Sequence, residues 1–211
     1  MQLEKRDFDR EAMKWDENPG RVKLAKDIYA AIIKAVSISP ETDALDYGCG
    51  TGLLTLLLQP HVRHITGTDS SQGMLDMLNQ KIDQLLLPNV ATKFLDLEKD
   101  ALLEGRYNLI TCSMTLHHAE NPASLIEKLY AGLLPGGSLC IADLDSEDGA
   151  FHSSNDGVFH FGFERSVMTD LFDKIGLDDV NLTTAAQVTK KDATSRNKTF
   201  PIFLITGKRP V

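Results

Sequence analysis

Cysteine is scarce in this sequence: the chain has three, Cys49, Cys112 and Cys140, and none of them shows C-x-x-C spacing. This argues against a disulfide framework and against a zinc site, so we expect no metal. No apolar run approaches the roughly 20 residues of a membrane span. The charged stretch Glu4-Lys5-Arg6-Asp7 also lacks the apolar core of a signal peptide. We therefore expect an unexported, cytoplasmic protein without a membrane span.

Positive charge is also in short supply, because 22 lysines and arginines face 30 acidic residues and leave a net charge of −8. Proteins that bind nucleic acid through its phosphates normally present a basic face. The basic cluster Lys190, Lys191, Arg196 and Lys198 falls in a polar stretch between two expected strands. We interpret it as a solvated loop and expect no nucleic-acid partner.

The 211 residues, 42% of them hydrophobic, suit one globular domain. Short apolar runs alternate with segments of helical period, which predicts an α/β fold with a parallel sheet. The expected strands are 42–47, 64–69, 90–95, 107–112, 138–143, 180–188 and 200–207, the last two as an antiparallel hairpin. We divide the domain into an N-terminal helical arm (1–40), a nucleotide-binding core (41–143), a lid (144–165) and a C-terminal helix and hairpin (166–211).

A glycine-rich turn follows the first expected strand, in the run Asp46-Tyr47-Gly48-Cys49-Gly50-Thr51-Gly52. Glycine takes positive φ cheaply and lets a ligand approach the backbone. The amides at the start of the next helix then point at that ligand. A dinucleotide fingerprint would need glycine where Leu53 stands, and a P-loop would need lysine after Gly52. Neither pattern is present.

Acidic residues end the second and third expected strands. Asp69 follows Gly52 by 17 residues, about one helix and one strand, so its carboxylate should face the glycine turn and accept hydrogen bonds from a ribose. The alternative is a helix cap. Asp96 could accept a hydrogen bond from an adenine amino group, with Leu97 against the ring. The alternative there is an ordinary acid of a surface loop.

Histidines lie where an open α/β sheet places its chemistry, at the carboxyl end of the fourth strand. We name His118 and His117 first as proton acceptors, then His160 and His152 of the lid, since histidine titrates near neutral pH. Capping or packing histidines, and a reaction without a dedicated base, remain alternatives.

Phe8 and Trp15 stand seven residues apart in a charged segment. This spacing suits one face of a short helix. The pair could fasten the N-terminal arm to the body of the protein, or it could fold over the mouth of the site.

These motifs together resemble the class I methyltransferases that use S-adenosylmethionine (SAM), most of all the branch that includes the ubiquinone and menaquinone biosynthesis methyltransferases. Besides the turn and the two acids, the resemblance rests on Ser113 to His118 and on Leu134-Pro135-Gly136-Gly137. It implies a single-domain Rossmann-like fold with a mostly parallel seven-stranded sheet and a C-terminal antiparallel hairpin. It also implies SAM as cofactor and S-adenosylhomocysteine (SAH) as product. The cofactor-binding set that it implies is Asp46, Gly48, Cys49, Gly50, Thr51, Gly52, Asp69, Ser70, Met74, Asp96, Leu97 and Ser113.

The sequence also departs from related enzymes. Methyltransferases that act on amino groups of nucleobases and glutamine carry [DN]-P-P-[YF] where this chain has Ser113-Met114-Thr115-Leu116, and the cysteines do not suit an arsenite methyltransferase. We expect methyl transfer to an oxygen, carbon or nitrogen of a small-molecule acceptor, by a monomer or homodimer. A SAM-binding protein without turnover and a protein methyltransferase are the alternatives.

Overall fold

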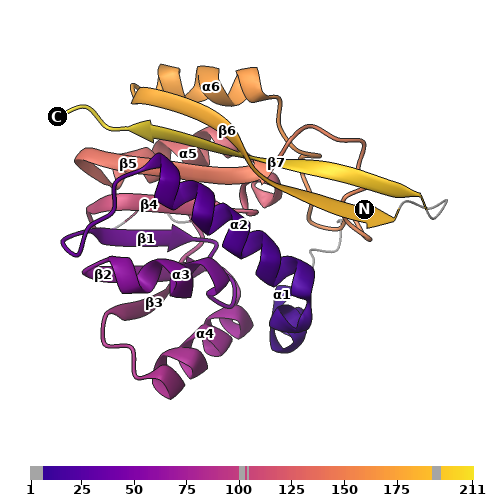
Figure 1. Ribbon diagram of the computed structural model, residues 1–211, viewed down its shortest axis with the longest axis horizontal. Helices are drawn as coiled ribbons and strands as arrows, with labels where there is room; N and C mark the ends of the chain where they lie inside the picture. Colours follow the sequence, from indigo (N-terminus) through magenta and orange to yellow (C-terminus); the bar gives the residue numbers. More distant parts are fainter. Residues whose placement is uncertain (1–6, 100–102, 104, 192–195) are drawn as a thin grey trace.

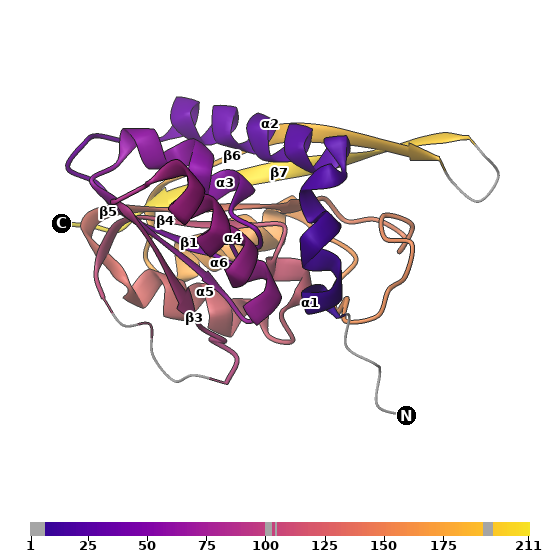
Figure 2. The ribbon, with the colours of Figure 1, turned by 90° about the horizontal axis from the view of Figure 1, so that it is seen from below.

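The computed structural model describes residues 7–99, 103, 105–191 and 196–211. The charged stretch at residues 4–6 therefore lies outside the described residues. Strands of one sheet and helices on both of its faces make up the fold (Figures 1 and 2). The strands are β1 (Asp43–Tyr47), β2 (His64–Asp69), β3 (Val90–Phe94), β4 (Tyr107–Ser113), β5 (Leu133–Leu144), β6 (Asp178–Lys191) and β7 (Asn197–Lys208). The helices are α1 (Phe8–Glu11), α2 (Pro19–Ala35), α3 (Leu53–Leu58), α4 (Gln72–Leu85), α5 (Pro122–Ala131) and α6 (Arg165–Lys174), with the 3₁₀ turns η1 (Ala12–Glu17), η2 (Gln59–His61) and η3 (Leu116–His118).

The sheet has the strand order β3-β2-β1-β4-β5-β7-β6, with β7 antiparallel to both of its neighbours and the other pairs parallel. This confirms the predicted α/β fold, with a mostly parallel seven-stranded sheet and a C-terminal antiparallel hairpin. The carboxyl ends of β1, β2 and β4 meet at one edge of the sheet, where open α/β sheets bind their ligands.

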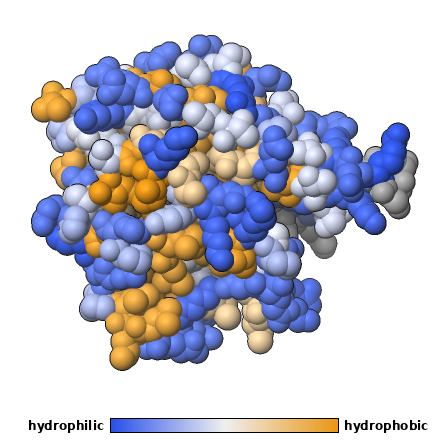
Figure 3. Space-filling view, in the orientation of Figure 1, coloured by the Kyte–Doolittle hydropathy of each residue, from blue (hydrophilic) through white to orange (hydrophobic). Residues whose placement is uncertain are grey.

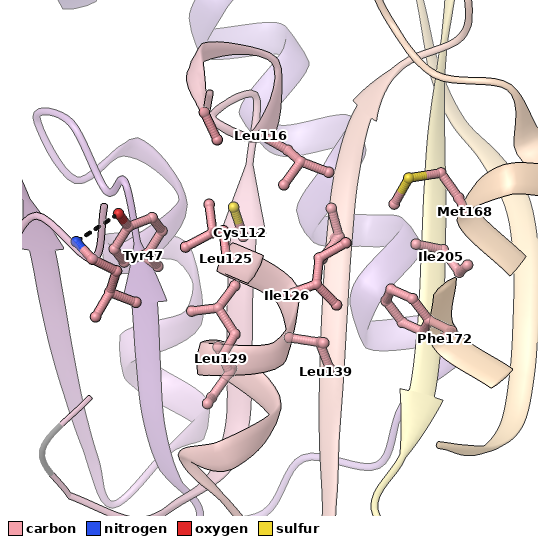
Figure 4. Close-up of a cluster of buried hydrophobic side chains, with 14 of the residues drawn as sticks. Tyr47, Cys112, Leu116, Leu125, Ile126, Leu129, Leu139, Met168, Phe172 and Ile205 are labelled. Carbon is pink, nitrogen blue, oxygen red and sulfur yellow. Dashed lines mark hydrogen bonds between the residues drawn. The ribbon is translucent and has the colours of Figure 1, made fainter. Parts of the chain in front are cut away.

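Apolar side chains fill both faces of the sheet, because the central strands are buried on both sides. Successive residues of β4 show this: Leu109 packs with α2 and α3, and Ile110 packs with α5 on the opposite face. Figure 4 shows the second of these clusters, in which α5 and α6 cover the sheet. The hydroxyl of Tyr47 accepts a hydrogen bond there from the amide of Leu97 at 3.3 Å.

Two sequence-based boundaries were wrong. The expected strand 138–143 begins earlier, because β5 already pairs with β4 at Leu133 and a bulge with Gly136 at φ 76° restores the pairing at Ser138. The expected loop around the basic cluster is mostly strand. Lys190 pairs with Lys198 as the β6–β7 ladder continues past the body of the sheet, and polar residues are tolerated there because the hairpin is largely exposed to solvent.

The face of the molecule in Figure 3 is mostly hydrophilic, with hydrophobic residues gathered in places among the polar ones. Exposed apolar residues such as Leu85 and Leu86, at the end of α4, are ordinary in a protein surface. Among the described residues, no helix combines the length and the apolarity that crossing a bilayer would require.

Candidate cofactor and acceptor site

The glycine turn between β1 and α3 has the conformation that the sequence predicts, with φ of 69° at Gly48, 54° at Gly50 and 83° at Gly52. A Cβ on Gly48 would lie 2.2 Å from the Thr115 hydroxyl oxygen, so the backbone can approach β4 only with glycine there. At Gly50 an added Cβ would meet only the Met74 sulfur, at 3.9 Å. The turn therefore presents bare backbone to the space above it.

Asp46 lies beneath this turn and is 1% exposed. Its carboxylate accepts hydrogen bonds from the hydroxyls of Thr55, at 2.6 Å, and Thr111, at 2.8 Å. Burial raises its pKa to about 6, against the opposing effect of these two bonds. The carboxylate links β1 to α3 and β4, and it is not among the groups that line the cavity described next.

A cavity of about 830 Å³ opens above the turn. It lies at the carboxyl edge of the sheet and receives side chains from the arm, from the lid and from β6. Its lining residues are Phe8, Trp15, Asn18, Gly20, Arg21, Leu24, Tyr47, Gly48, Gly50, Asp69, Ser70, Met74, Leu95, Met114, Thr115, His117, His118, Ala150, Phe151, His152, Ser153, Val188, Lys190 and Lys191.

Gly48 and Gly50 of the glycine turn line the cavity together with Asp69, Ser70 and Met74, and all five belong to the cofactor-binding set that the sequence predicts. Asp69 ends β2, and its carboxylate accepts hydrogen bonds from the amide of Gly50, at 2.8 Å, and of Ser71, at 2.9 Å. Burial raises the pKa of Asp69, and these backbone bonds oppose the shift. The acid therefore faces the glycine turn, as its spacing predicts.

Other members of the predicted set lie beside the cavity rather than in its lining. Cys49 packs against Leu75 and Leu78, and Thr51 gives its hydroxyl to Asp16. The remaining predicted residues outside the lining are Asp46, Gly52, Asp96, Leu97 and Ser113.

Two lining residues are neighbours of predicted ones. Leu95 lines the cavity where the sequence predicted Leu97, and Thr115 where it predicted Ser113. Leu97 instead belongs to the core, and Asp96 forms an ion pair with Lys99 at 2.8 Å. A strand tip shifted by two residues keeps the same face of the sheet, so spacing alone could not separate these candidates.

The N-terminal arm contributes Phe8 and Trp15 to the lining of the cavity and is fastened at two points, Asp9 and Asp16. The rings of Phe8 and Trp15 meet edge to face at 6.0 Å, and both line the cavity. Asp9 accepts hydrogen bonds from the Ser71 hydroxyl, at 2.6 Å, and the Gly73 amide, at 2.7 Å. These bonds lower the pKa of Asp9.

The second fastening point of the arm is Asp16. Its carboxylate accepts a hydrogen bond from the Thr51 hydroxyl at 2.5 Å and pairs with Lys81 of α4. Through Asp9 and Asp16 together, the arm is joined to the start of α4 and to the glycine turn.

Three of the four predicted histidines line the cavity together. The ring centroid of His117 lies 4.2 Å from that of His118 and 5.0 Å from that of His152. His160 does not line the cavity and instead packs against Phe163 at 5.4 Å. No group of histidine, cysteine and acidic side chains in the described part of the chain is arranged to hold a metal ion.

His117 forms a buried pair with Asp143, a residue to which the sequence assigned no role. Its Nδ1 lies 2.7 Å from Oδ1 of Asp143, and the two side chains are 1% and 0% exposed. Burial raises the pKa of Asp143, but the charge and hydrogen bonds of His117 outweigh it and leave this pKa below its usual value. An ionised Asp143 places the proton of a neutral imidazole on Nδ1. The Nε2 of His117 is buried and has no hydrogen-bond partner among the described residues.

His118 is held differently, since its Nδ1 lies 2.6 Å from the carbonyl oxygen of Gly157. The only signal for Asp143 was its place at the end of the fifth strand. Finding it required the register in which Ser113 of β4 pairs with Ala142 of β5.

The strand order, the single antiparallel strand, the glycine turn and the acid after β2 define the class of the protein: it has the fold of the class I SAM-dependent methyltransferases. A family model described as "Methyltransferase domain" matches residues 19–182, and the chain belongs to that family. The resemblance drawn from the sequence, and SAM as the cofactor of this family, are thereby confirmed.

Curated proteins of similar sequence are also named as methyltransferases. The chain is 30% identical over 158 residues to an uncharacterized methyltransferase of Schizosaccharomyces pombe, covering 68% of this chain and 56% of that protein. It is 35% identical over 104 residues to a ubiquinone biosynthesis O-methyltransferase of Coxiella burnetii, covering 48% of this chain and 43% of that protein. The chain thus spans about half the length of the curated relatives it matches.

Solved structures share the fold. The YcgJ protein of Bacillus subtilis has a TM-score of 0.71 at 14% identity, over 87% of this chain and 98% of that one. A SAM-dependent methyltransferase of Aquifex aeolicus has a TM-score of 0.68 at 17% identity, over 95% of this chain and 97% of that one.

Proposed function

We propose that this protein transfers the methyl group of SAM to a small-molecule acceptor, and that His117 accepts the acceptor's proton. The observation that carries the proposal is a single cavity. It joins the bare backbone of Gly48 and Gly50 and the carboxylate of Asp69 to the buried imidazole of His117. Cofactor and acceptor could therefore meet inside one enclosed space.

The cofactor end fits SAM in shape and in chemistry. The open space above Gly50 admits the methionine part without a Cβ in its path. Asp69 offers a carboxylate to the ribose hydroxyls, and Met74 and Leu95 offer apolar surface to the adenine ring. Asp46, beneath the turn, would hold the turn in shape rather than touch the cofactor.

The acceptor end supplies alignment and a base. Bound SAM supplies a methyl carbon on a sulfonium that leaves as a neutral thioether. As the electron pair of the acceptor's oxygen, nitrogen or carbon forms the new bond to that carbon, Nε2 of His117 takes the acceptor's proton. Asp143 keeps the ring in the tautomer that can accept it and stabilises the imidazolium that results. Holding both reactants in line supplies up to roughly 7–11 kcal/mol of the catalysis.

A small acceptor suits the enclosure better than a peptide does. Phe8 and Trp15 of the arm and Phe151 of the lid all line the cavity, and Phe151 is 7% exposed. A protein substrate would need an open groove in their place.

The first test is calorimetric titration with SAH, with NADH and ATP as controls, followed by a screen of phenols, quinols and small amines for SAH release. We expect selective SAH binding, and turnover that His117→Gln reduces by about 100-fold or more without weakening SAH binding. A folded protein that does not bind SAH would contradict the proposal. SAH binding without turnover on any acceptor would favour a protein that binds the cofactor only.

A further inference from the structure

The described residues of the cavity lining include more basic than acidic side chains. Arg21, Lys190 and Lys191 line the cavity, whereas Asp69 is the only carboxylate among the described residues of the lining. This local excess stands against a net charge of −8 for the chain.

The cations come from two elements that face each other. Leu24, one turn after Arg21 on α2, packs in the same apolar cluster as Val188 of β6. Residues two apart in a strand share a face, so Lys190 lies on the same side of β6 as Val188. Arg21 and Lys190 are thus brought to one wall, with apolar side chains between them and the core.

Neighbouring groups hold both cationic heads at the wall. The Lys190 ammonium lies 3.5 Å from the centre of the Phe151 ring and donates to the Phe151 carbonyl. The Arg21 guanidinium lies 3.6 Å from the centre of the Trp15 ring and pairs with Glu11 at 3.4 Å. Because these contacts already restrain the two side chains, ligand binding costs little further side-chain entropy. Solvent and salt also screen a half-buried charge less than an exposed one.

We infer that the acceptor is a small anion, carrying a carboxylate or a phosphate on an apolar body. This rests on the proposed function and names its substrate class. The anionic group lies against Lys190, and the apolar body lies along Leu24 and Phe151. The group to be methylated then points toward His117, which lines the same cavity.

The test uses the protein saturated with SAH and three probes: phenylacetate, benzyl phosphate and the neutral phenylacetamide. Calorimetry should show at least one anion binding about 10-fold or more tightly than the amide. The stronger anion identifies a carboxylate or a phosphate as the preferred group. Lys190→Gln should remove most of this preference, and Lys208→Gln, the same charge change at the far end of the hairpin, should keep it.

The outcomes separate the two proposals. Equal affinity for anion and amide, no anion bound at millimolar concentration, or an unchanged preference in Lys190→Gln would each overturn the anionic acceptor. SAH binding, measured first on every variant, reports on the cofactor site alone, and it should be the same in Lys190→Gln as in the unaltered protein.

Discussion

Asp46 is a carboxylate that burial makes hard to ionise, and this gives a testable pH dependence. Its pKa rises from 3.8 to about 6 on folding, so between these values the unfolded chain loses a proton that the folded protein keeps. The stability from this difference is complete below about pH 4 and is lost as pH rises through 6. Relative to Asp46→Asn, the unaltered protein should lose about 2 kcal/mol of unfolding free energy between pH 4 and pH 7.

Urea unfolding of both proteins at several pH values measures this difference, and other titrating groups cancel in the comparison. Asp173→Asn, on the exposed side of α6, is the control for the substitution itself. A difference between Asp46→Asn and the unaltered protein that does not vary with pH would mean that Asp46 ionises in the folded protein as easily as in the unfolded chain.

Asp143 acts on chemistry only through His117, and a conservative change can show this. Asp143→Asn keeps the shape of the side chain but permits the other imidazole tautomer, with the proton on Nε2. We expect kcat to fall about 100-fold or more while the dissociation constant of SAH is unchanged. The pH profile of kcat should also shift, which a purely structural defect would not produce. Asp173→Asn serves as the control, and normal turnover in a folded Asp143→Asn protein would remove His117 from the role of base.

Asp69 is the acid that we assign to the ribose. Asp69→Ala should weaken SAM binding by about 10–100-fold, because charge-assisted hydrogen bonds are lost and two backbone amides lose their acceptor. Calorimetry with SAH measures the change. Asp76→Ala, an exposed acid on α4 that accepts only from Gln72 among the described contacts, should bind as the unaltered protein does. An unchanged affinity in Asp69→Ala would exclude the ribose role.

At the scale of elements, polar side chains rather than a shared core join the arm to the cofactor loops, which are residues 48–52 and 69–74. Asp16→Asn weakens the contacts to Thr51 and Lys81, so the arm should open more often and SAH should bind roughly 10-fold less tightly. The free energy of unfolding should change by less than about 1 kcal/mol. Asp27→Asn, which breaks an exposed pair with Lys23 on α2, should leave SAH binding unaltered. The same affinity in both variants would mean that the arm does not cover the bound cofactor.

Periodicity and turn chemistry predicted the elements of the core well. The second strand, 64–69, matches β2 in full. The local sequence pattern gave a wrong boundary where strand pairing decides the structure. The expected strand 138–143 leaves out residues 133–137, which already belong to β5 and include a bulge. The contacts of the arm, such as Asp9 with Gly73, join residues 64 positions apart, and no local signal marks them.

The residues of the candidate site also fall into those that a local sequence pattern predicts and those that depend on strand pairing. The glycine turn and Asp69 could be found because their backbone requirement and their spacing are visible in the sequence. The pair His117 and Asp143 could not, because it depends on the register between two strands that are separated by a helix.

At the scale of the whole molecule, the cavity has a rigid floor and two separate covers. The floor is the edge of a sheet that is packed on both faces. The arm is joined to the cofactor loops, whereas the lid is joined to the hairpin, where Lys190 holds Phe151 and Lys198 pairs with Asp148. Figure 2 shows the arm and the hairpin at the same end of the molecule. The described polar contacts that fasten the arm and those that fasten the lid therefore have different partners.

Amide hydrogen exchange can test whether the arm and the lid move independently. SAH alone should slow exchange in the arm (8–17) and in the cofactor loops (48–52 and 69–74), because binding steadies the loops to which Asp9 and Asp16 are fastened. Exchange at 150–153 and 188–191 should change less than about twofold until an acceptor-site anion is added as well. Slowing of the lid and hairpin by SAH alone, as large as in the arm, would mean that the two covers close as one unit and that cofactor binding completes the acceptor end.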